Sequence, residues 1–453
     1  MEHRYYGESN PFSDYSTAHL KYLTSEQALA DAAQFLEFFV NDLKKSDQIR
    51  KVIVVGGSYT GAMSSWFRMR FPNLVIGSIA SSAPVYLQEE FMKYDEHISQ
   101  ALPPECQKNV VDAMDKIDAL IDNGEEWKKM IERTKCEAIT NPVDWEYVLA
   151  DAVAWAVQYN SYTSEDKDKH TIDLLCSTLN ATDEKKDIKD KLFDFIDSYY
   201  NLLHPNCLDA SSSYDSLKNE TLDPAKNQRQ WFYQSCTEFG YFQVASTDNT
   251  KRTRSTRIDL AYHRALCKKL YNIDVDITPT KKIYMQDNMI GTNIIWTNGD
   301  VDPWMELSIT PDDSNTTSAH TNVAVTKDGR EKRQNWRVLL ITNGSHCSDL
   351  GTPSPEDSES LTHTRTEMRK EIDRWIATSA AGSGKYNTRA PLFIFSIIAY
   401  VISFVLFLCG VAFIVLRFVS LPCFSSSYSS MDDEHIDEKN ASKDYQSSVN
   451  SYN

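Results

Sequence analysis

The chain has 453 residues, of which 41% are apolar and 11% aromatic, and its formal net charge at pH 7 is −17. This apolar content is enough for a large buried core and excludes an intrinsically disordered chain. The acidic balance argues against a nucleic-acid partner, because phosphate binding requires clustered lysine and arginine and the basic cluster at residues 251–257 is short.

The first strong feature along the chain is an apolar strand that ends in a glycine-rich turn. Residues 52–55 read Val-Ile-Val-Val, and residues 56–61 read Gly-Gly-Ser-Tyr-Thr-Gly. The glycines permit backbone angles that a side chain would obstruct, so we expect Ser58 to project from a strand-to-helix turn as a nucleophile. The backbone N–H of Tyr59 is expected to stabilise an oxyanion. The pattern departs from G-x-S-x-G at Thr60, and a tight strand-to-helix connection without a catalytic role is the alternative.

The long middle of the chain, residues 91–271, is dominated by helical periodicity. Apolar residues recur at helical spacing in 110–121 and in 188–199, with turn-forming breaks between such segments. We therefore predict a helical cap that is inserted into an α/β domain. Such a cap would lie over the strand ends and narrow the access to Ser58.

Two later apolar strands each end in a loop with a residue suited to catalysis. Residues 293–297 precede a loop that contains Asp302, and residues 338–342 precede a loop that contains His346. The carboxyl ends of parallel strands meet at one edge of a sheet, so both loops are expected at the same rim.

The chain order Ser, Asp, His is the order that α/β-hydrolases use. A serine hydroxyl is inert at neutral pH until a base removes its proton. His346 has a suitable pKa for this task, and Asp302 would fix the tautomer of the imidazole. We therefore predict a triad of Ser58, His346 and Asp302. Taken singly, a loop histidine is more often a surface residue, and an aspartate before proline often only begins a turn.

A long uncharged segment lies near the C-terminus. Residues 391–416 contain no charged side chain, and a helix of this length crosses the roughly 30 Å of hydrocarbon in a bilayer. We therefore predict a transmembrane helix, with a buried core helix as the alternative. Positive charges flank the segment on both sides and do not decide its orientation.

Cysteines and glycosylation sequons indicate the secretory route and place residues 1–390 outside the cytosol. Seven cysteines precede the apolar segment without the paired spacing of a metal site, so we expect several disulfides, no metal and no other cofactor. The odd count leaves one thiol, and Cys347 is expected to be free. The sequons predicted to be glycosylated are Asn180, Asn219 and Asn315, while Asn343, close to His346, is the least expected.

Five sequence blocks resemble the prolylcarboxypeptidase-like serine peptidases. The blocks are residues 2–9, 56–61, 231–240, 298–304 and 344–349. The resemblance implies that Ser58 is the nucleophile, that Asp302 rather than Asp300 is the acid, and that His346 is the base. It also implies hydrolysis of short peptides, commonly after proline, in an acidic compartment.

The chain departs from this family at its start. Family members have several further strands and a Gly-Asn-Glu-Gly-type oxyanion loop before the block at residues 2–9, whereas Met1 directly precedes that block here. We therefore expect either that the chain start is misplaced or that the product is an N-terminally truncated member. Loss of one oxyanion donor typically lowers kcat by roughly 10² to 10³. A catalytically inactive hydrolase fold that serves as a membrane receptor or adhesion module is the alternative function, and a lipid or ester hydrolase fits the geometry as well.

The predicted fold is an α/β-hydrolase sheet with an inserted helical cap domain and a C-terminal transmembrane helix. The predicted divisions are 1–90 and 272–378 for the hydrolase domain, 91–271 for the cap, 379–390 for a stalk, 391–416 for the transmembrane helix and 417–453 for a cytosolic tail.

The predicted function is that of a serine exopeptidase, either a dipeptidyl-peptidase or a carboxypeptidase. Met63, Trp231 and Trp304 are candidate walls around a proline ring, with simple core packing as the alternative. We expect short peptides as substrates, membrane contact through the C-terminal span, no nucleic acid, and a homodimer as one option. The expected location is the lysosomal or endosomal membrane or the plasma membrane, with the catalytic domain lumenal or extracellular.

Overall fold

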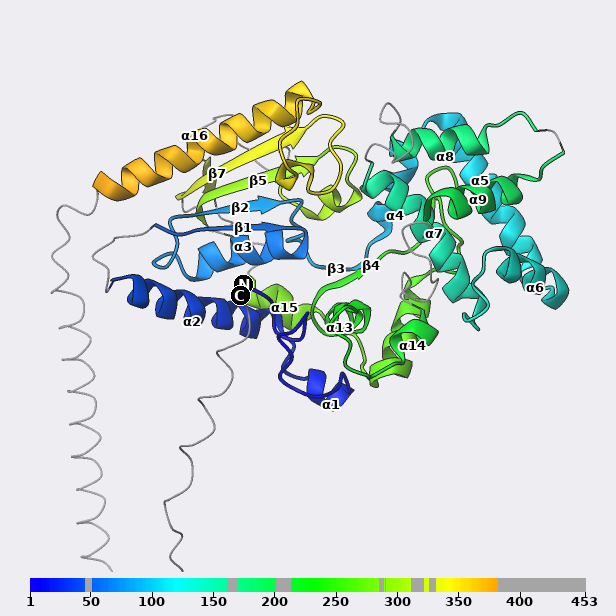
Figure 1. The fold of residues 1–453 in the computed structure, drawn as a ribbon, viewed down its shortest axis with the longest axis horizontal. Coiled ribbons are helices and arrows are strands. Elements are labelled where there is room, and N and C mark those ends of the chain that lie inside the picture. The colour runs from blue at the N-terminus through cyan, green and yellow to red at the C-terminus, as the bar shows by residue number, and fades with distance from the viewer. Residues whose placement is uncertain are drawn as a thin grey trace, which may run out of the picture. The chain divides into compact units, whose positions relative to one another are not determined.

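A five-stranded sheet is built from the N-terminal and C-terminal parts of the chain (Figure 1). Its strand order is β1-β2-β5-β7-β6, in which β1, β2, β5 and β7 run parallel and β6 pairs antiparallel with β7. The strands are β1 (Ile53–Gly57), β2 (Gly77–Ser81), β5 (Thr292–Gly299), β6 (Asn322–Val325) and β7 (Glu331–Ile341). The computed structural model describes residues 1–44, 51–160, 170–183, 185–200, 213–284, 289, 291–310, 322–325 and 331–381.

Helices cover both faces of this sheet, because successive side chains of a strand point to opposite faces and both faces are apolar. On β5, Trp296 packs in the same cluster as residues of α3 (Tyr59–Arg70), whereas Ile295 packs in a cluster with Trp375 of α16 (Glu359–Ala381). The helix α2 (Ser25–Lys44) contacts α3. The prediction of a mixed α/β fold around a parallel sheet is confirmed.

The chain between β2 and β5 is mainly helical and includes a second sheet of two parallel strands, β3 (Gln88–Glu90) and β4 (Gly240–Phe242). The helix α7 begins where the side chain of Asn141 accepts a hydrogen bond from the N–H of Val143, with Pro142 as its first residue. The domain limits at residues 91 and 271 stay a prediction, since the described residues belong to one compact unit. The helices of this region are α4 (Met92–Ala101), α5 (Pro104–Leu120), α6 (Gly124–Arg133), α7 (Pro142–Gln158), α8 (Thr171–Leu179), α9 (Ile188–Phe195), η1 (Ile196–Tyr200), α12 (Tyr214–Leu217), α13 (Gln228–Gln234), η2 (Ser235–Phe239), α14 (Leu260–Tyr271) and α15 (Thr278–Ile283).

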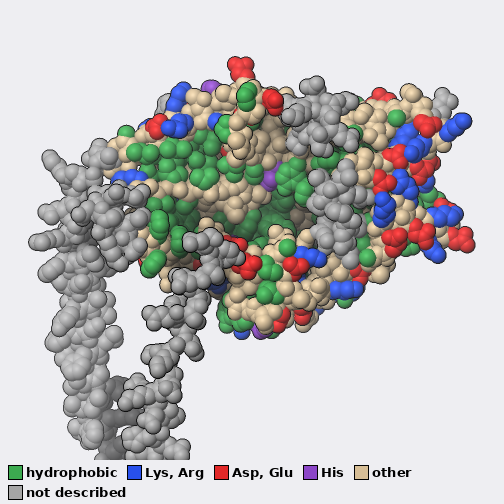
Figure 2. All heavy atoms as spheres, viewed as in Figure 1, with side chains coloured by type: hydrophobic (Ala, Val, Ile, Leu, Met, Phe, Trp, Pro, Cys, Tyr) green, Lys and Arg blue, Asp and Glu red, His purple; other side chains and the backbone are tan. Residues whose placement is uncertain are grey.

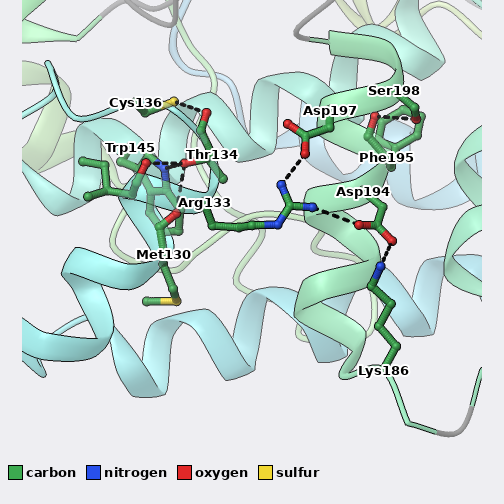
Figure 3. Close-up of polar contacts among 11 residues, drawn as sticks. Met130, Arg133, Thr134, Cys136, Trp145, Lys186, Asp194, Phe195, Asp197 and Ser198 are labelled. Atoms are coloured by element: carbon green, nitrogen blue, oxygen red, sulfur yellow. Dashed lines mark hydrogen bonds and ion pairs between the residues drawn. The ribbon is translucent and has the colours of Figure 1, made fainter.

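Polar contacts tie the helices of this region to one another (Figure 3). The guanidinium of Arg133, the last residue of α6, pairs with Asp194 of α9 at 2.9 Å and also with Asp197 of η1. The indole N–H of Trp145 on α7 donates to the hydroxyl of Thr134 at 2.9 Å. The apolar core of these helices is therefore bordered by contacts that fix α6, α7 and α9 relative to one another.

Disulfides add covalent links to the same region. Cys106 of α5 is bonded to Cys176 of α8, and Cys236 of η2 is bonded to Cys267 of α14. Cys136 is also disulfide-bonded. Among the described cysteines, Cys347 is free. The expectations of several disulfides and of a free Cys347 are confirmed for this part of the chain.

Several predicted features of the secretory route can be placed only in part. The sequon residues Asn180 and Asn219 are exposed, and Asn315 lies outside the described residues. The predicted transmembrane segment 391–416, with the stalk and the tail, also lies outside them. Of the helices that are described, none combines the length and the apolar character that a membrane span requires.

A carboxylate is buried within the helical region. Glu146 on α7 is 0% exposed, and Asp118 on α5 and Arg257 are among its neighbours. Burial, followed by the carboxyl group of Asp118, raises the pKa of Glu146 to about 9, while the charge of Arg257 opposes this shift. The folded state therefore binds a proton at Glu146 that the unfolded chain releases near pH 4 to 5.

This burial predicts that the fold loses stability as the pH rises from about 4.5 towards 9. Glu146→Gln imitates the protonated side chain, so we expect the free energy of unfolding at pH 7 to increase by up to about 3 kcal/mol, with little change at pH 4.5. Denaturant unfolding at both pH values measures the difference. The exposed residue Glu137 provides the control Glu137→Gln, which should change stability by less than about 0.5 kcal/mol. An equal gain at both pH values would contradict the interpretation.

Candidate active site

Ser58 occupies a sharp turn between β1 and α3. Its backbone has φ 57° and ψ −131°, a combination that side chains rarely adopt, and its N–H donates to the carbonyl oxygen of Ser81 at 2.9 Å. Such strain costs on the order of 1–3 kcal/mol and persists where the surrounding structure imposes it, often at functional sites. The hydroxyl of Ser58 caps no backbone group of α3.

The glycines around Ser58 are required by close contacts. A Cβ atom on Gly56 would lie 1.9 Å from the carbonyl oxygen of Thr60, and a Cβ atom on Gly61 would lie 2.6 Å from that of Ser81. Thr60 itself is exposed, and its hydroxyl bonds to both the N–H and the carbonyl of Gly57. The position that departs from G-x-S-x-G therefore has room for a side chain, and Gly61 is the residue that lets α3 approach β2.

A buried acid–base pair lies in the loops that follow β5 and β7. Asp302 follows β5, and its Oδ2 is 2.8 Å from Nδ1 of His346, which follows β7. The side chains are 0% and 4% exposed. The other carboxylate oxygen, Oδ1, accepts a hydrogen bond from the backbone N–H of Trp304 at 3.0 Å. With Nδ1 engaged by Asp302, Nε2 is the nitrogen that remains for proton transfer.

Asp302 makes His346 a stronger base. Burial alone lowers the pKa of the imidazole, but the charge and hydrogen bond of Asp302, with a smaller contribution from Cys347, outweigh it and raise the pKa of His346 above its ordinary value. Asp300 contacts α4 through its backbone, since its carbonyl oxygen lies 3.1 Å from Nε2 of His97. The structure thus pairs His346 with Asp302.

The histidine loop is fixed to the ends of β2 and β5. The carboxylate of Asp349 accepts hydrogen bonds from the hydroxyls of Ser81 on β2 and Thr297 on β5. The N–H of Cys347 donates to the hydroxyl of Ser82 at 2.9 Å, and the N–H of Ser82 donates to the carbonyl of Thr297 at 2.8 Å. The loop after β7 is therefore held across the edge of the sheet towards β1.

These contacts bring the neighbours of Ser58 and His346 together. A Cβ atom on Gly57 would lie 2.8 Å from Sγ of Cys347, so the residue before Ser58 touches the residue after His346. The hydrogen bonds of His346 itself run to Asp302 and to the backbone carbonyl of Gln158. The face drawn in Figure 2 is hollowed in its middle, where hydrophobic side chains gather around a histidine.

Tyr59 directly follows Ser58 in the first turn of α3. Its N–H is one of the helix N-terminal donors without an intrahelical acceptor, as an oxyanion site requires. Its hydroxyl lies 3.0 Å from Nε2 of His3 and accepts a hydrogen bond from Gln234 at 3.1 Å. Burial raises the pKa of Tyr59 well above its ordinary value, so the phenol stays neutral. These contacts hold the ring and thereby the first turn of α3.

Of the three candidate wall residues, the two tryptophans share a neighbouring ring, whereas Met63 lies apart from them. Trp231 packs against the ring of Tyr59 at 5.7 Å, and Trp304 lies 6.5 Å from the imidazole of His346. Both tryptophans contact Tyr241, at 6.3 and 5.6 Å. Met63 instead lines a hollow together with Ala28, Val55 and His3, and neither tryptophan is among its lining residues.

Sequence reasoning missed several residues that hold this site. Tyr241 joins the two tryptophans, Gln158 contacts the acid–base pair, and Ser82 holds the histidine loop. Ser82 follows the end of β2, so the rule that polar residues after parallel strands converge could have found it. Gln158 and Tyr241 have no such local signal. Within the described ranges, no group of three or more histidine, cysteine, aspartate or glutamate residues has the arrangement of a metal site.

Comparison with known proteins identifies related chains. A family model described as Serine carboxypeptidase S28 matches residues 1–368. The probable serine protease EDA2 of Arabidopsis thaliana is 33% identical over 405 residues, which cover 83% of this chain and 75% of that protein. Human lysosomal Pro-X carboxypeptidase is 28% identical over 408 residues, with 85% and 76% covered. Human thymus-specific serine protease is 26% identical over 400 residues, with 83% and 73% covered.

The buried pair predicts the effect of removing the charge of Asp302. In Asp302→Asn the imidazole loses the carboxylate that stabilises its protonated form, so its pKa falls and the acid limb of the kcat/KM profile moves to lower pH. We expect kcat to fall by roughly 10³ to 10⁴, because the amide favours the wrong tautomer. Steady-state kinetics on a chromogenic peptide across pH measures both effects.

Asp300→Asn is the matched control for this substitution. Its side chain lies outside the pair, so kcat should fall by less than about tenfold and the acid limb should stay in place. A larger loss in Asp300→Asn than in Asp302→Asn would show that the acid has been assigned to the wrong residue.

Proposed function

We propose that this chain, which belongs to the serine carboxypeptidase S28 family and is a serine-type peptidase, hydrolyses short peptides through an acyl-enzyme formed on Ser58. The observation that supports this most is the buried contact of 2.8 Å between His346 and Asp302, next to the strained turn that presents Ser58. The resemblance inferred from the five sequence blocks is confirmed by the family match.

In the proposed reaction, Nε2 of His346 removes the proton from the hydroxyl of Ser58 as the serine oxygen attacks the scissile carbonyl carbon. Asp302 keeps the proton on Nδ1 and stabilises the imidazolium. The N–H of Tyr59 stabilises the oxyanion of the tetrahedral intermediate. The imidazolium then protonates the leaving amine. Water attacks the acyl-enzyme with His346 again as the base, and the second peptide product leaves Ser58 with its proton restored.

The proposed substrates are short peptides cut after proline near the carboxyl end. A chain of ring contacts runs from Tyr59 through Trp231, Tyr241 and Trp304 to the imidazole of His346. A proline ring packs well on such aromatic faces. The family description names carboxypeptidases, and the human relative is named a Pro-X carboxypeptidase. A catalytically inactive receptor or adhesion module is not favoured, because these relatives are named proteases.

Removal of the nucleophile tests the proposal. We expect Ser58→Ala to abolish labelling by a fluorophosphonate probe and to lower peptide hydrolysis by roughly 10⁴-fold or more. Ser13→Ala, at an exposed serine, is the control and should label as the wild type does. Peptides with a blocked amino end and a free carboxyl end after proline should be cut faster than peptides with the opposite ends blocked. Labelling that persists in Ser58→Ala would overturn the assignment.

The proposed location is lumenal or extracellular, with residues 391–416 as a membrane anchor. The disulfides, the exposed sequons at Asn180 and Asn219, and a relative named as lysosomal support the compartment. The uncharged run of residues 391–416 supports the anchor.

Fractionation of cells tests the anchor. Alkaline carbonate should leave the full chain in the membrane pellet, and deletion of residues 391–453 should release it. Release of the full chain by carbonate would contradict the proposal.

A further inference from the structure

Four residues form a closed hydrogen-bond circuit around the acid–base pair. The N–H of His346 donates to the backbone carbonyl of Gln158 at 2.8 Å, and Oε1 of Gln158 accepts from the indole N–H of Trp304 at 2.8 Å. The backbone N–H of Trp304 donates to Oδ1 of Asp302 at 3.0 Å, and Oδ2 of Asp302 contacts Nδ1 of His346 at 2.8 Å. We call these four residues the circuit.

The circuit joins three distant parts of the chain. Gln158 is the last residue of α7 and is 8% exposed, Trp304 belongs to the short 3₁₀ helix η4 (Pro303–Leu307) after β5, and His346 follows β7. Oε1 of Gln158 accepts a second hydrogen bond from the hydroxyl of Tyr94 on α4, at 2.8 Å. One amide oxygen therefore connects two helices of the helical region to the loop of Asp302.

The end of α7 is suited to hold a histidine that gains charge. The last carbonyls of a helix have no intrahelical donor, and that of Gln158 receives its hydrogen bond from His346. The C-terminus of a helix also has partial negative charge, which favours an imidazolium. The ring of Tyr159, the next residue, stands edge-on to the imidazole at a centroid distance of 5.8 Å. Both the backbone and the ring of His346 are thus bounded by the end of α7.

We propose that Gln158 is a positioning residue for the acid–base pair and that it couples α7 to the catalytic rim. This inference rests on the proposed function. Gln158 reaches Asp302 through Trp304 and reaches His346 through its own backbone, so its side chain acts on the carboxylate rather than on the substrate. Loss of Oε1 leaves the buried indole N–H of Trp304 without its acceptor. Trp304, whose backbone N–H supports Oδ1 of Asp302, is then held less firmly, and so is the carboxylate that it aims at Nδ1.

The experiment compares three variants of the full chain. Gln158→Met keeps the length of the side chain and removes the acceptor. We expect kcat to fall roughly 10- to 100-fold, because small misplacements of a catalytic group have effects of this size, with KM within about threefold. The acid limb of kcat/KM should move to lower pH, since a loosened Asp302 raises the pKa of His346 less.

Gln158→Glu keeps an acceptor for Trp304 and adds negative charge near His346. We expect kcat to stay closer to the wild type than in Gln158→Met, and the acid limb should move to higher pH. The opposite directions of the two shifts distinguish positioning from a general loss of stability, which would not reverse the sign.

Tyr94→Phe is the matched control, because it removes the other hydrogen bond to the same Oε1 and leaves the circuit intact. Its kcat and acid limb should equal those of the wild type. If Gln158→Met and Tyr94→Phe behave alike, or if both Gln158 variants shift the limb in one direction, the inference is overturned. Where Gln158→Met does not fold, Trp304→Phe removes the same hydrogen bond from its donor side and is compared with Gln158→Glu and Tyr94→Phe by the same criteria.

A second measurement separates this inference from the proposed function. Proton NMR of the Nδ1–H resonance of His346 reports its titration without any substrate. A wild type that hydrolyses no peptide would overturn the proposed function, yet a lower pKa of His346 in Gln158→Met than in the wild type would still support the circuit. An unchanged titration in Gln158→Met would overturn the inference even in an active enzyme.

Discussion

The shared carboxyl edge of the parallel strands is the constraint on which the rest of the site depends. β1 leads into Ser58, β5 into the loop of Asp302 and β7 into the loop of His346. Ser81 at the end of β2 and Ser82 directly after it fasten the histidine loop. Because parallel strands end at the same edge, residues hundreds of positions apart meet there without any long-range sequence signal. The buried core on both faces of the sheet fixes the register of the strands. The register in turn fixes the point along the sheet edge at which each loop begins.

The helical region between β2 and β5 contributes to the site through hydrogen bonds to the catalytic loops. His97 on α4 bonds to the loop of Asp302, and Gln158 at the end of α7 bonds to both catalytic loops. These contacts are buried, where an unpaired polar group costs on the order of 1–3 kcal/mol. The buried Glu146 on α7 makes the fold more stable at acidic than at neutral pH, because burial raises the pKa of its carboxyl group. The helix α7 thus carries both a carboxyl group on which the pH dependence of stability rests and a residue that contacts the loops of the acid–base pair.

The candidate site could be predicted from sequence wherever a local pattern imposes the geometry. The glycines around Ser58 predicted the strained turn, and the strands before Asp302 and His346 predicted the shared rim. Gln158 could not be found in this way, since nothing in its local sequence distinguishes the end of α7 from any other helix end. Met63 shows the opposite limit, because the sequence offered it together with two tryptophans as an apolar wall, yet the hollow that it lines includes neither tryptophan.

The sequence by itself determined the parallel α/β architecture, the chain order of the three candidate catalytic residues and the resemblance to the family. These follow from short-range patterns, because the spacing of apolar residues and the positions of glycines determine the local conformation of the backbone. Only the tertiary structure decided that Asp302 lies within 2.8 Å of His346 and that close packing requires glycine at position 61 rather than at position 60. It also decided that the end of α7 closes a hydrogen-bond circuit around that pair. Hydrogen bonds between loops depend on directions and distances of about 3 Å, which packing alone sets.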